Sequence, residues 1–305
     1  MSAILITGGT GFVGKQLIPL LQQEGYTIHV FTRKKDIAEK NGIKYFTWNP
    51  ETGDYDPKAF DGVEYILSLA GAGVADKRWT SFYKKEILNS RVESIQLLVK
   101  ALKETPNTVH TVINASATGW YGADTPASVA QGGFTEDDPA AGTFLGSVCR
   151  QWEEAAHLFS TLNKRLVIFR IGIVLHPDGG MMKELLKPLR FGLATVLGNP
   201  QQVISWIHVH DLCRAMLFAV QHKKVEGIYN AVNTTPVTNS ELVTAIAKSR
   251  KKFYIKIPVP RFILKIMVGQ FSEEITRSAT VNGKKLANAG FRFNYTEINE
   301  AVKPA

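Results

Sequence analysis

The chain opens with an apolar stretch of strand length, residues 3–6, which three glycines follow at once. Gly8, Gly11 and Gly14 stand in the spacing TGxxGxxG, and a helical pattern runs over 12–23. Glycines alone are weak evidence, because many turns contain them. A strand, a glycine turn and a helix in this order form a dinucleotide-binding fingerprint.

Each glycine of this fingerprint has a separate physical task. The first allows a tight turn, the second lets the backbone approach a pyrophosphate, and the third lets the helix pack close to the strand. The free N–H groups of the helix N-terminus then face the phosphates. We expect the phosphates to lie over 10–13. The residues predicted to hold them are Gly8, Thr10, Gly11, Phe12, Val13 and Gly14.

A second apolar strand pattern, 27–31, ends in two cations, Arg33 and Lys34. An NAD-specific site would carry a carboxylate here, which accepts hydrogen bonds from the ribose hydroxyls. An arginine suits the 2′-phosphate of NADP instead, with lysine assisting, so the pattern predicts NADP(H) as the cofactor. A surface arginine at a strand end is the alternative explanation.

Strand and helix patterns alternate over the first two thirds of the chain, which predicts an α/β fold with a doubly wound parallel sheet. Beyond Ile173 the alternation loosens, and the stretch up to Trp206 reads as glycine-rich and hairpin-like. We expect a cofactor-binding domain over 1–175, completed by about 203–235, and a smaller lobe over 176–202 and 236–305. The strand patterns cover 3–6, 27–31, 43–48, 62–71, 109–115, 166–170 and 227–232, and the helical patterns cover 12–23, 81–103, 144–162 and 208–221.

Composition limits the partners. Of 305 residues, 45% are hydrophobic and 21% charged, which is ordinary for a globular protein, and no apolar run is long enough to cross a membrane. Cys149 and Cys213 are too few for a disulfide framework or a zinc site. The net charge of +9 is spread along the chain, with its densest run at 248–256, and indicates a solvated surface. We expect a cytoplasmic protein without metal, nucleic acid or membrane partner.

The glycine spacing resembles the short-chain dehydrogenase/reductase superfamily, particularly its extended branch. Further stretches resemble one group within that branch, usually labelled epimerase family proteins, which carries a C-terminal domain of unknown function. These stretches are SATGWYG at 116–122, VCRQWE at 148–153, PDGG at 177–180, SWIHV at 205–209, PVTN at 236–239 and NAGFRF at 288–293. The resemblance implies a Rossmann fold of the extended short-chain reductase type, NADP binding, and a smaller C-terminal substrate lobe.

The resemblance also implies where the rest of the cofactor lies. Small residues at the end of the 62–71 strand would let the adenosine ribose and pyrophosphate pass, and two further strand ends would line the nicotinamide. A homodimer through the long helices at 81–103 and 144–162 is a further expectation. The predicted cofactor contacts of this group are Leu69, Ala70, Gly71, Ala115, Ser116, Ile171 and Gly172.

The catalytic pair of the superfamily is absent. Active relatives use Tyr-x-x-x-Lys on a helix, where the lysine lowers the pKa of the tyrosine. The equivalent positions here are Phe144 and Val148, and Trp152 continues an apolar face at i, i+4, i+8. Ser116 and Tyr121 are the remaining catalytic candidates. If the chain is matched to the superfamily without a gap, however, Ala117 and not Ser116 stands at the position of the superfamily's catalytic serine.

Two functions therefore compete. One is an NADP(H)-dependent oxidoreductase or epimerase with an altered acid/base set, acting on a small molecule. The other is a non-catalytic NADPH-binding sensor. Nucleotide sugars are a poor fit because Ile204 or Ser205 stands where related epimerases place a diphosphate-binding arginine. We read Cys149 as an inert buried thiol, His208 as structural, and the acidic run at 136–138 as a solvated loop.

Replacing Arg33 with alanine should weaken NADPH binding by about 10-fold or more, because one charge-assisted hydrogen bond contributes about 1.5–3 kcal/mol. NADH affinity should hardly change, since NADH lacks the 2′-phosphate. Isothermal titration calorimetry with both cofactors measures this difference. An equal loss for both would show that Arg33 does not read the phosphate.

Overall fold

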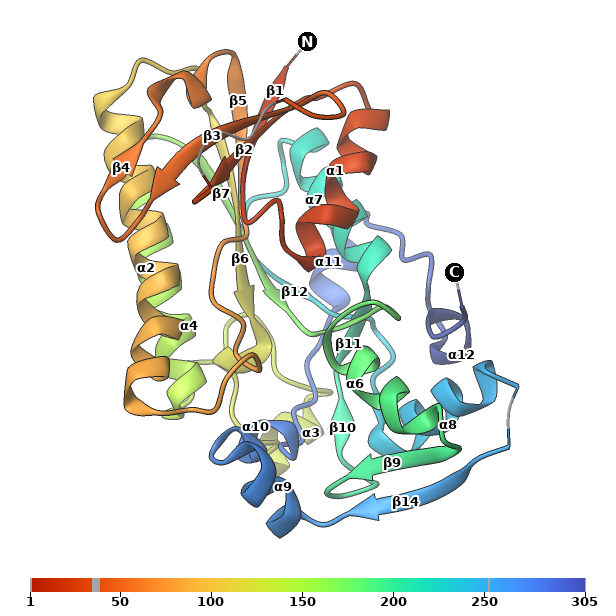
Figure 1. Ribbon diagram of the computed structural model, residues 1–305. Coiled ribbons are helices and arrows are strands. Elements are labelled where there is room, and N and C mark those ends of the chain that lie inside the picture. Colours follow the sequence, from red (N-terminus) through yellow and green to blue (C-terminus); the bar gives the residue numbers. More distant parts are fainter. Residues whose placement is uncertain (1, 35–38, 252, 305) are drawn as a thin grey trace.

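The computed structural model describes residues 2–34, 39–251 and 253–304. Eight strands form one sheet in the order β12-β7-β6-β5-β1-β2-β3-β4 (Figure 1). All pairings are parallel except that of the short β4 (Asp54–Tyr55). The predicted parallel α/β sheet is thus confirmed. The other strands are β1 (Ala3–Thr7), β2 (Thr27–Thr32), β3 (Ile43–Asn49), β5 (Val63–Ser68), β6 (Thr111–Ala117), β7 (Arg165–Ile171) and β12 (Gly227–Ala231).

Helices cover both faces of this sheet (Figure 1). On one face α1 (Phe12–Gln23) packs beside α7 (Val209–Gln221), and both contribute to one hydrophobic core. On the other face α2 (Ser81–Glu104) packs beside α4 (Phe144–Ala156) over a second core. The helix expected over 144–162 is in fact two, because α4 ends at Ala156 and the short α5 (Leu158–Thr161) follows.

A third core belongs to segments that lie outside the main sheet. There β9 (Leu193–Leu197) pairs in parallel with β14 (Ile255–Val259), and β10 (Val203–Ile204) pairs with β13 (Val237–Thr238). The expected hairpin before Trp206 is therefore wrong. Its strands pair with segments farther along the chain, which a local glycine pattern cannot reveal.

The remaining elements are short. They are η1 (Pro57–Phe60), η2 (Thr118–Trp120), α3 (Pro126–Ala130), β8 (Ile173–Leu175), α6 (Gly180–Leu189), β11 (Trp206–His208), α8 (Asn239–Ser249), α9 (Arg261–Val268), α10 (Phe271–Ile275), α11 (Lys284–Asn288) and α12 (Ile298–Ala301). Over the described ranges, none of the helices is both long and apolar enough to pass through a bilayer.

A buried hydroxyl joins the two central strands where the glycine turn begins. Thr7, at the end of β1, is fully buried. Its Oγ1 accepts hydrogen bonds from the N–H groups of Leu69 at 3.1 Å and Ala70 at 3.2 Å, just after β5. Strand order reverses beside β1, and ligands of open α/β sheets bind at such a point. Thr7 therefore fixes the edge at which a cofactor would lie.

Replacing Thr7 with valine should lower the free energy of unfolding by about 1–3 kcal/mol, because the N–H of Ala70 loses its acceptor. Thr7→Ser keeps the hydroxyl and is the matched control, with a smaller loss. Urea unfolding followed by circular dichroism gives both values. Equal stability of the two variants would show that this hydrogen bond contributes nothing.

Candidate functional site

The glycine turn presents an open helix N-terminus. Gly11 is the N-cap of α1, no side chain caps the helix, and its first turn carries no acidic residue. Gly8 has a φ of 71°, and a Cβ there would lie 2.8 Å from the carbonyl carbon of Leu69. A Cβ on Gly14 would lie 2.6 Å from the carbonyl oxygen of Gly8. Both glycines are thus required by packing, and they leave the helix N–H groups available to an anion.

Gly11 has a different reason to be glycine. A Cβ there would meet one atom within 4 Å, the carbonyl oxygen of Gly8 at 3.1 Å, and would otherwise point into open space. Thr10 and Gly11 are exposed, and Phe12 and Val13 are half-buried. The missing side chain keeps the approach to the helix N-terminus clear. The cradle formed by residues 8–14 therefore has room for a pyrophosphate group, and contact of 10–13 with phosphates stays a prediction.

Two cations lie at the same edge of the sheet. β1 and β2 pair in parallel, with Thr7 opposite Phe31, so the residues after β2 emerge on the side of the glycine turn. Arg33 and Lys34 are both exposed there. The position suits a ribose phosphate, which lies next to the pyrophosphate in a dinucleotide. Contact of these two side chains with a cofactor stays a prediction.

A third cation at this edge escaped the sequence analysis. Arg91 of α2 donates hydrogen bonds to the carbonyl oxygens of Ile87 at 2.8 Å and Ala72 at 3.0 Å. Its guanidinium lies over the Trp152 ring, 5.0 Å from the centroid, and a Cβ on Gly71 would stand 3.0 Å from Arg91 Cζ. Burial lowers the pKa of Arg91. In sequence, an arginine inside a long polar helix looks like an ordinary surface residue.

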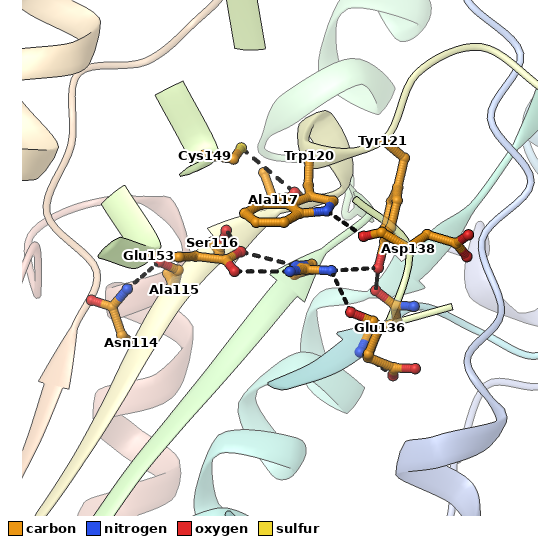
Figure 2. Close-up of polar contacts among 12 residues, drawn as sticks. Asn114, Ala115, Ser116, Ala117, Trp120, Tyr121, Glu136, Asp138, Cys149 and Glu153 are labelled. Atoms are coloured by element: carbon orange, nitrogen blue, oxygen red, sulfur yellow. Dashed lines mark hydrogen bonds and ion pairs between the residues drawn. The ribbon is translucent and has the colours of Figure 1, made fainter. Parts of the chain in front are cut away.

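The two catalytic candidates belong to a buried ion-pair network (Figure 2). Arg170 of β7 makes a bidentate pair with Glu153 of α4, with Nε–Oε1 at 3.0 Å and Nη2–Oε2 at 2.9 Å. Ser116 donates to Glu153 Oε1 at 2.6 Å. Arg170 Nη1 donates to the hydroxyl of Tyr121 at 3.0 Å, and that hydroxyl donates to Asn230 Oδ1 at 2.7 Å.

This network isolates both hydroxyls from solvent. Ser116 is 2% exposed and Tyr121 is fully buried. Burial raises the pKa of Tyr121 to about 12. The indole of Trp120 covers the Arg170 guanidinium at 3.7 Å from the ring centroid. The geometry thus supports a structural role for Ser116 and Tyr121, and their catalytic role stays a prediction.

The positions of the missing tyrosine and lysine lie in an apolar cluster, as the sequence predicts. Phe144 and Val148 pack with Trp79, and the Phe144 and Trp79 rings meet edge to face at 5.0 Å. Phe271 of α10 lies 5.3 Å from the same indole. The third residue of the expected face, Trp152, belongs instead to the core between α2, α4 and the sheet.

A lysine lies at the edge of this apolar cluster. Lys84 Nζ is 4.8 Å from the centroid of the Phe144 ring and 5.6 Å from that of Trp79. Sequence alone does not reveal this contact, because Lys84 stands on α2, far in sequence from Phe144. A cation–π contact with each ring holds this ammonium group beside the position of the lost tyrosine.

The other residues singled out from the sequence have structural surroundings. Cys149 is buried, its thiol donates to the carbonyl oxygen of Ala117 at 3.6 Å, and burial raises its pKa to about 11. His208 caps α7 and stacks on Tyr295 at 3.7 Å. Burial lowers the pKa of His208 to about 4, so its imidazole is neutral at pH 7.

Gly172, a predicted cofactor contact, and the nearby Ser205 are closely packed by protein. A Cβ on Gly172 would stand 2.6 Å from both the carbonyl oxygen of Ser205 and the side chain of Val232. The Ser205 hydroxyl donates to Ala279 O at 2.9 Å and accepts from the N–H of Val281 at 2.9 Å. Cofactor contacts of Ala115, Ile171 and Gly172 stay predictions.

The acidic loop at 136–138, which the sequence predicts to be solvated, is held by hydrogen bonds to backbone N–H groups. Glu136 Oε1 accepts from the N–H of Asn230 at 2.7 Å, and Asp138 Oδ2 accepts from the N–H of Thr135 at 2.6 Å. Of the side chains that the structure describes, no three His, Cys, Asp or Glu residues come together as a metal site would need.

An open parallel sheet with an uncapped helix N-terminus after its central strand defines the class of dinucleotide-binding α/β proteins. Residues 4–144 match the NAD dependent epimerase/dehydratase family, and 259–305 match a domain of unknown function, DUF1731. The chain is 31% identical over 304 residues to Epimerase family protein SAR0825 of Staphylococcus aureus, covering 99% of this chain and 98% of that protein. Epimerase family protein Mb2239 of Mycobacterium bovis is 31% identical over 302 residues, covering 99% and 96%.

The chain therefore belongs to the epimerase family proteins, within the extended short-chain dehydrogenase/reductases. Among solved structures, human epimerase family protein SDR39U1 with NADPH superimposes with a TM-score of 0.86 at 27% identity, covering 99% of this chain and 98% of that one. MoeE5, in complex with UDP-glucose and NAD, has a TM-score of 0.77 at 20% identity, covering 99% and 96%, and shows the shared fold alone.

Replacing Glu153 with glutamine should lower the free energy of unfolding by about 3–5 kcal/mol, because it leaves the buried Arg170 guanidinium without a counter-charge. Glu154→Gln is the matched control, since that side chain is 65% exposed and should change stability by less than about 0.5 kcal/mol. Chemical denaturation measures both. A Glu153→Gln protein as stable as the control would show that the Arg170–Glu153 pair does not stabilise the fold.

Proposed function

We propose that this chain binds NADP(H) in preference to NAD(H), and that it acts as an oxidoreductase or epimerase-like enzyme on a small substrate other than a nucleotide sugar. The observation that carries the proposal is Arg33, a cation after β2 beside the open N-terminus of α1. A carboxylate at this position would repel a 2′-phosphate, and a guanidinium attracts one. The NADPH in the structure of the human relative supports the same cofactor.

The residues that would hold the cofactor come from the ends of two strands, β1 and β2, and from the helix α2. The N–H groups at the start of α1 bind the pyrophosphate, and Arg33 with Lys34 binds the 2′-phosphate. Arg91, fixed beside Gly71, adds positive charge where the adenosine ribose and pyrophosphate are expected to pass. When bound, NADP(H) donates or accepts a hydride. The protein's task is to orient it and to hold a proton nearby.

The proton donor is not the usual tyrosine, because Phe144 has no ionisable group. Lys84 is the candidate that the geometry favours, since its ammonium lies beside the Phe144 ring. Tyr121 and Ser116 are weaker candidates because both are committed to the buried network. A nucleotide sugar is a poor substrate because Ile204 or Ser205 stands at the position of the diphosphate-binding arginine, and the Ser205 hydroxyl is already hydrogen-bonded to backbone groups of 279–281.

A second function, a non-catalytic NADPH sensor, draws on the same apolar cluster. Phe144 and Val148 remove the usual acid and its activating cation, whereas the glycine cradle is intact. A sensor needs cofactor affinity and no proton transfer. It differs from the enzyme in one respect, the role of Lys84.

We expect the wild type to bind NADPH at least about 10-fold more tightly than NADH and to oxidise NADPH slowly with some member of a panel of small carbonyl compounds. Lys84→Met should abolish this turnover without changing the NADPH dissociation constant. The neighbouring exposed Lys85→Met is the control and should behave as the wild type. Calorimetry and loss of absorbance at the NADPH band measure the two quantities.

The outcomes separate the two functions. NADPH binding without turnover, in both the wild type and a Phe144→Tyr/Val148→Lys variant, would favour the sensor. Turnover that survives in Lys84→Met would return the proton donor to Ser116 or Tyr121. NADH binding as tight as NADPH would overturn the cofactor assignment itself.

A further inference from the structure

Exposed hydrophobic side chains gather at one end of the molecule. In the described part of the chain, thirteen large hydrophobic residues are exposed, and nine of them lie on β9, β14, α9 and the turns beside them. Scattered exposed hydrophobics are ordinary, whereas a cluster marks an interaction surface. We call this cluster the tip surface. Its members are Phe191, Leu193, Phe253, Ile255, Ile257, Phe262, Ile263, Ile266 and Met267.

Strand pairing makes the tip surface continuous. Leu193 of β9 stands opposite Ile255 of β14 in the parallel ladder. The N–H of Ile255 donates to the carbonyl oxygen of Gly192 at 2.8 Å, which brings Phe191 near Phe253. Only Pro260 separates β14 from α9. Figure 1 shows β9, β14 and α9 together at the end of the molecule remote from the N-terminus.

The outer side of α9 is apolar where a surface helix should be polar. Leu264 is the residue that this helix buries against the protein, at 4% exposure. Phe262 and Ile266 are two positions away on either side, so both project about 200° from Leu264. They are 67% and 70% exposed. The helix therefore presents an apolar face outward, with nothing of this chain against it in the described structure.

Positive charge surrounds this face. Residues 248–268 contain seven lysines and arginines and no aspartate or glutamate. Lys256, Arg261 and Lys265 are exposed on β14 and α9 themselves. An exposed apolar face with basic residues at its margin is the pattern of elements that lie in the plane of a membrane surface. Each basic residue near an anionic leaflet adds attraction.

We propose that the tip surface docks on an anionic phospholipid bilayer, with the side chains of α9 and β14 in the headgroup region and the basic residues against lipid phosphates. The sequence predicts no membrane partner because no apolar run is long enough to span a bilayer. A protein that binds to the membrane surface needs no spanning segment. A second copy of this chain is a poorer occupant, because pairing two tip surfaces would bring their basic residues together. The proposal does not depend on the cofactor or the reaction.

Co-sedimentation with sucrose-loaded vesicles tests the proposal on the full-length protein. Vesicles of phosphatidylcholine with about 30% phosphatidylglycerol supply the anionic surface, and pure phosphatidylcholine is the reference. We expect binding to the anionic vesicles and weaker binding in about 0.5 M NaCl, which screens charge. Phe262→Ser/Ile266→Ser should reduce partitioning by about 10-fold or more, because two apolar side chains no longer leave water.

Two control variants, Phe82→Ser and Lys223→Glu/Lys224→Glu, separate docking through the tip surface from nonspecific binding to vesicles. Phe82→Ser removes a phenylalanine of α2 that is even more exposed than Phe262, at 79%, and should bind as the wild type. Arg261→Glu/Lys265→Glu should weaken binding by about 10-fold, whereas the exposed pair Lys223→Glu/Lys224→Glu should have no such effect.

Three results would overturn the proposal. The first is a wild type that does not bind anionic vesicles at about millimolar lipid. The second is an equal loss of binding in Phe82→Ser and in the double serine variant. The third is a dimer, measured by light scattering, that Phe262→Ser/Ile266→Ser dissociates, since this would make the tip surface a contact between two copies.

Discussion

The buried pair of Arg170 and Glu153 organises the end of the sheet where chemistry would be expected. A guanidinium and a carboxylate survive burial only if nearly every donor and acceptor is satisfied. Ser116 donates a hydrogen bond to Glu153, and Arg170 donates to the hydroxyl of Tyr121 and the carbonyl oxygen of Glu136. The ring of Trp120 covers one face of the guanidinium. The pair thereby fastens α4, β6, β7 and the loop before α4 together. It also holds the hydroxyls of Ser116 and Tyr121, the two catalytic candidates from the sequence, in buried hydrogen bonds.

At the edge of the sheet beside the glycine turn, here called the cofactor edge, polar groups are left open instead of being satisfied by the protein. Gly8 and Gly14 are fixed by packing and Thr7 by hydrogen bonds from the N–H groups of Leu69 and Ala70, yet the helix N-terminus beside them has no capping side chain. Polar groups left open at the edge of a rigid sheet are positioned before a ligand arrives, so little ordering is needed on binding. Rigid support beneath open backbone donors is what anion recognition requires, and the family membership agrees with it.

The cofactor edge and the tip surface obtain their positive charge in different ways. At the cofactor edge, charge comes from single residues on different elements, Arg33 after β2 and Arg91 on α2. At the tip surface, the positive charge and seven of the nine apolar residues come from one continuous segment after α8, and Phe191 and Leu193 come from β9 and the turn before it. This segment includes the start of the domain of unknown function. A surface that touches neither the glycine turn nor the buried pair can evolve a partner of its own.

The sequence by itself determined the sheet, the glycine turn and the cation after β2, because each depends on residues adjacent in the chain. Strand period, glycine spacing and an arginine at a strand end are local signals, and parallel pairing brings their ends to one edge. It also determined that Phe144 and Val148 replace an acid and a cation. Only the tertiary structure decided what surrounds those positions. Lys84 reaches Phe144 from another helix, Arg91 reaches Gly71 across a loop, and β9 pairs with a strand about sixty residues away. Contacts between distant segments are set by packing against several elements at once, which no local pattern encodes.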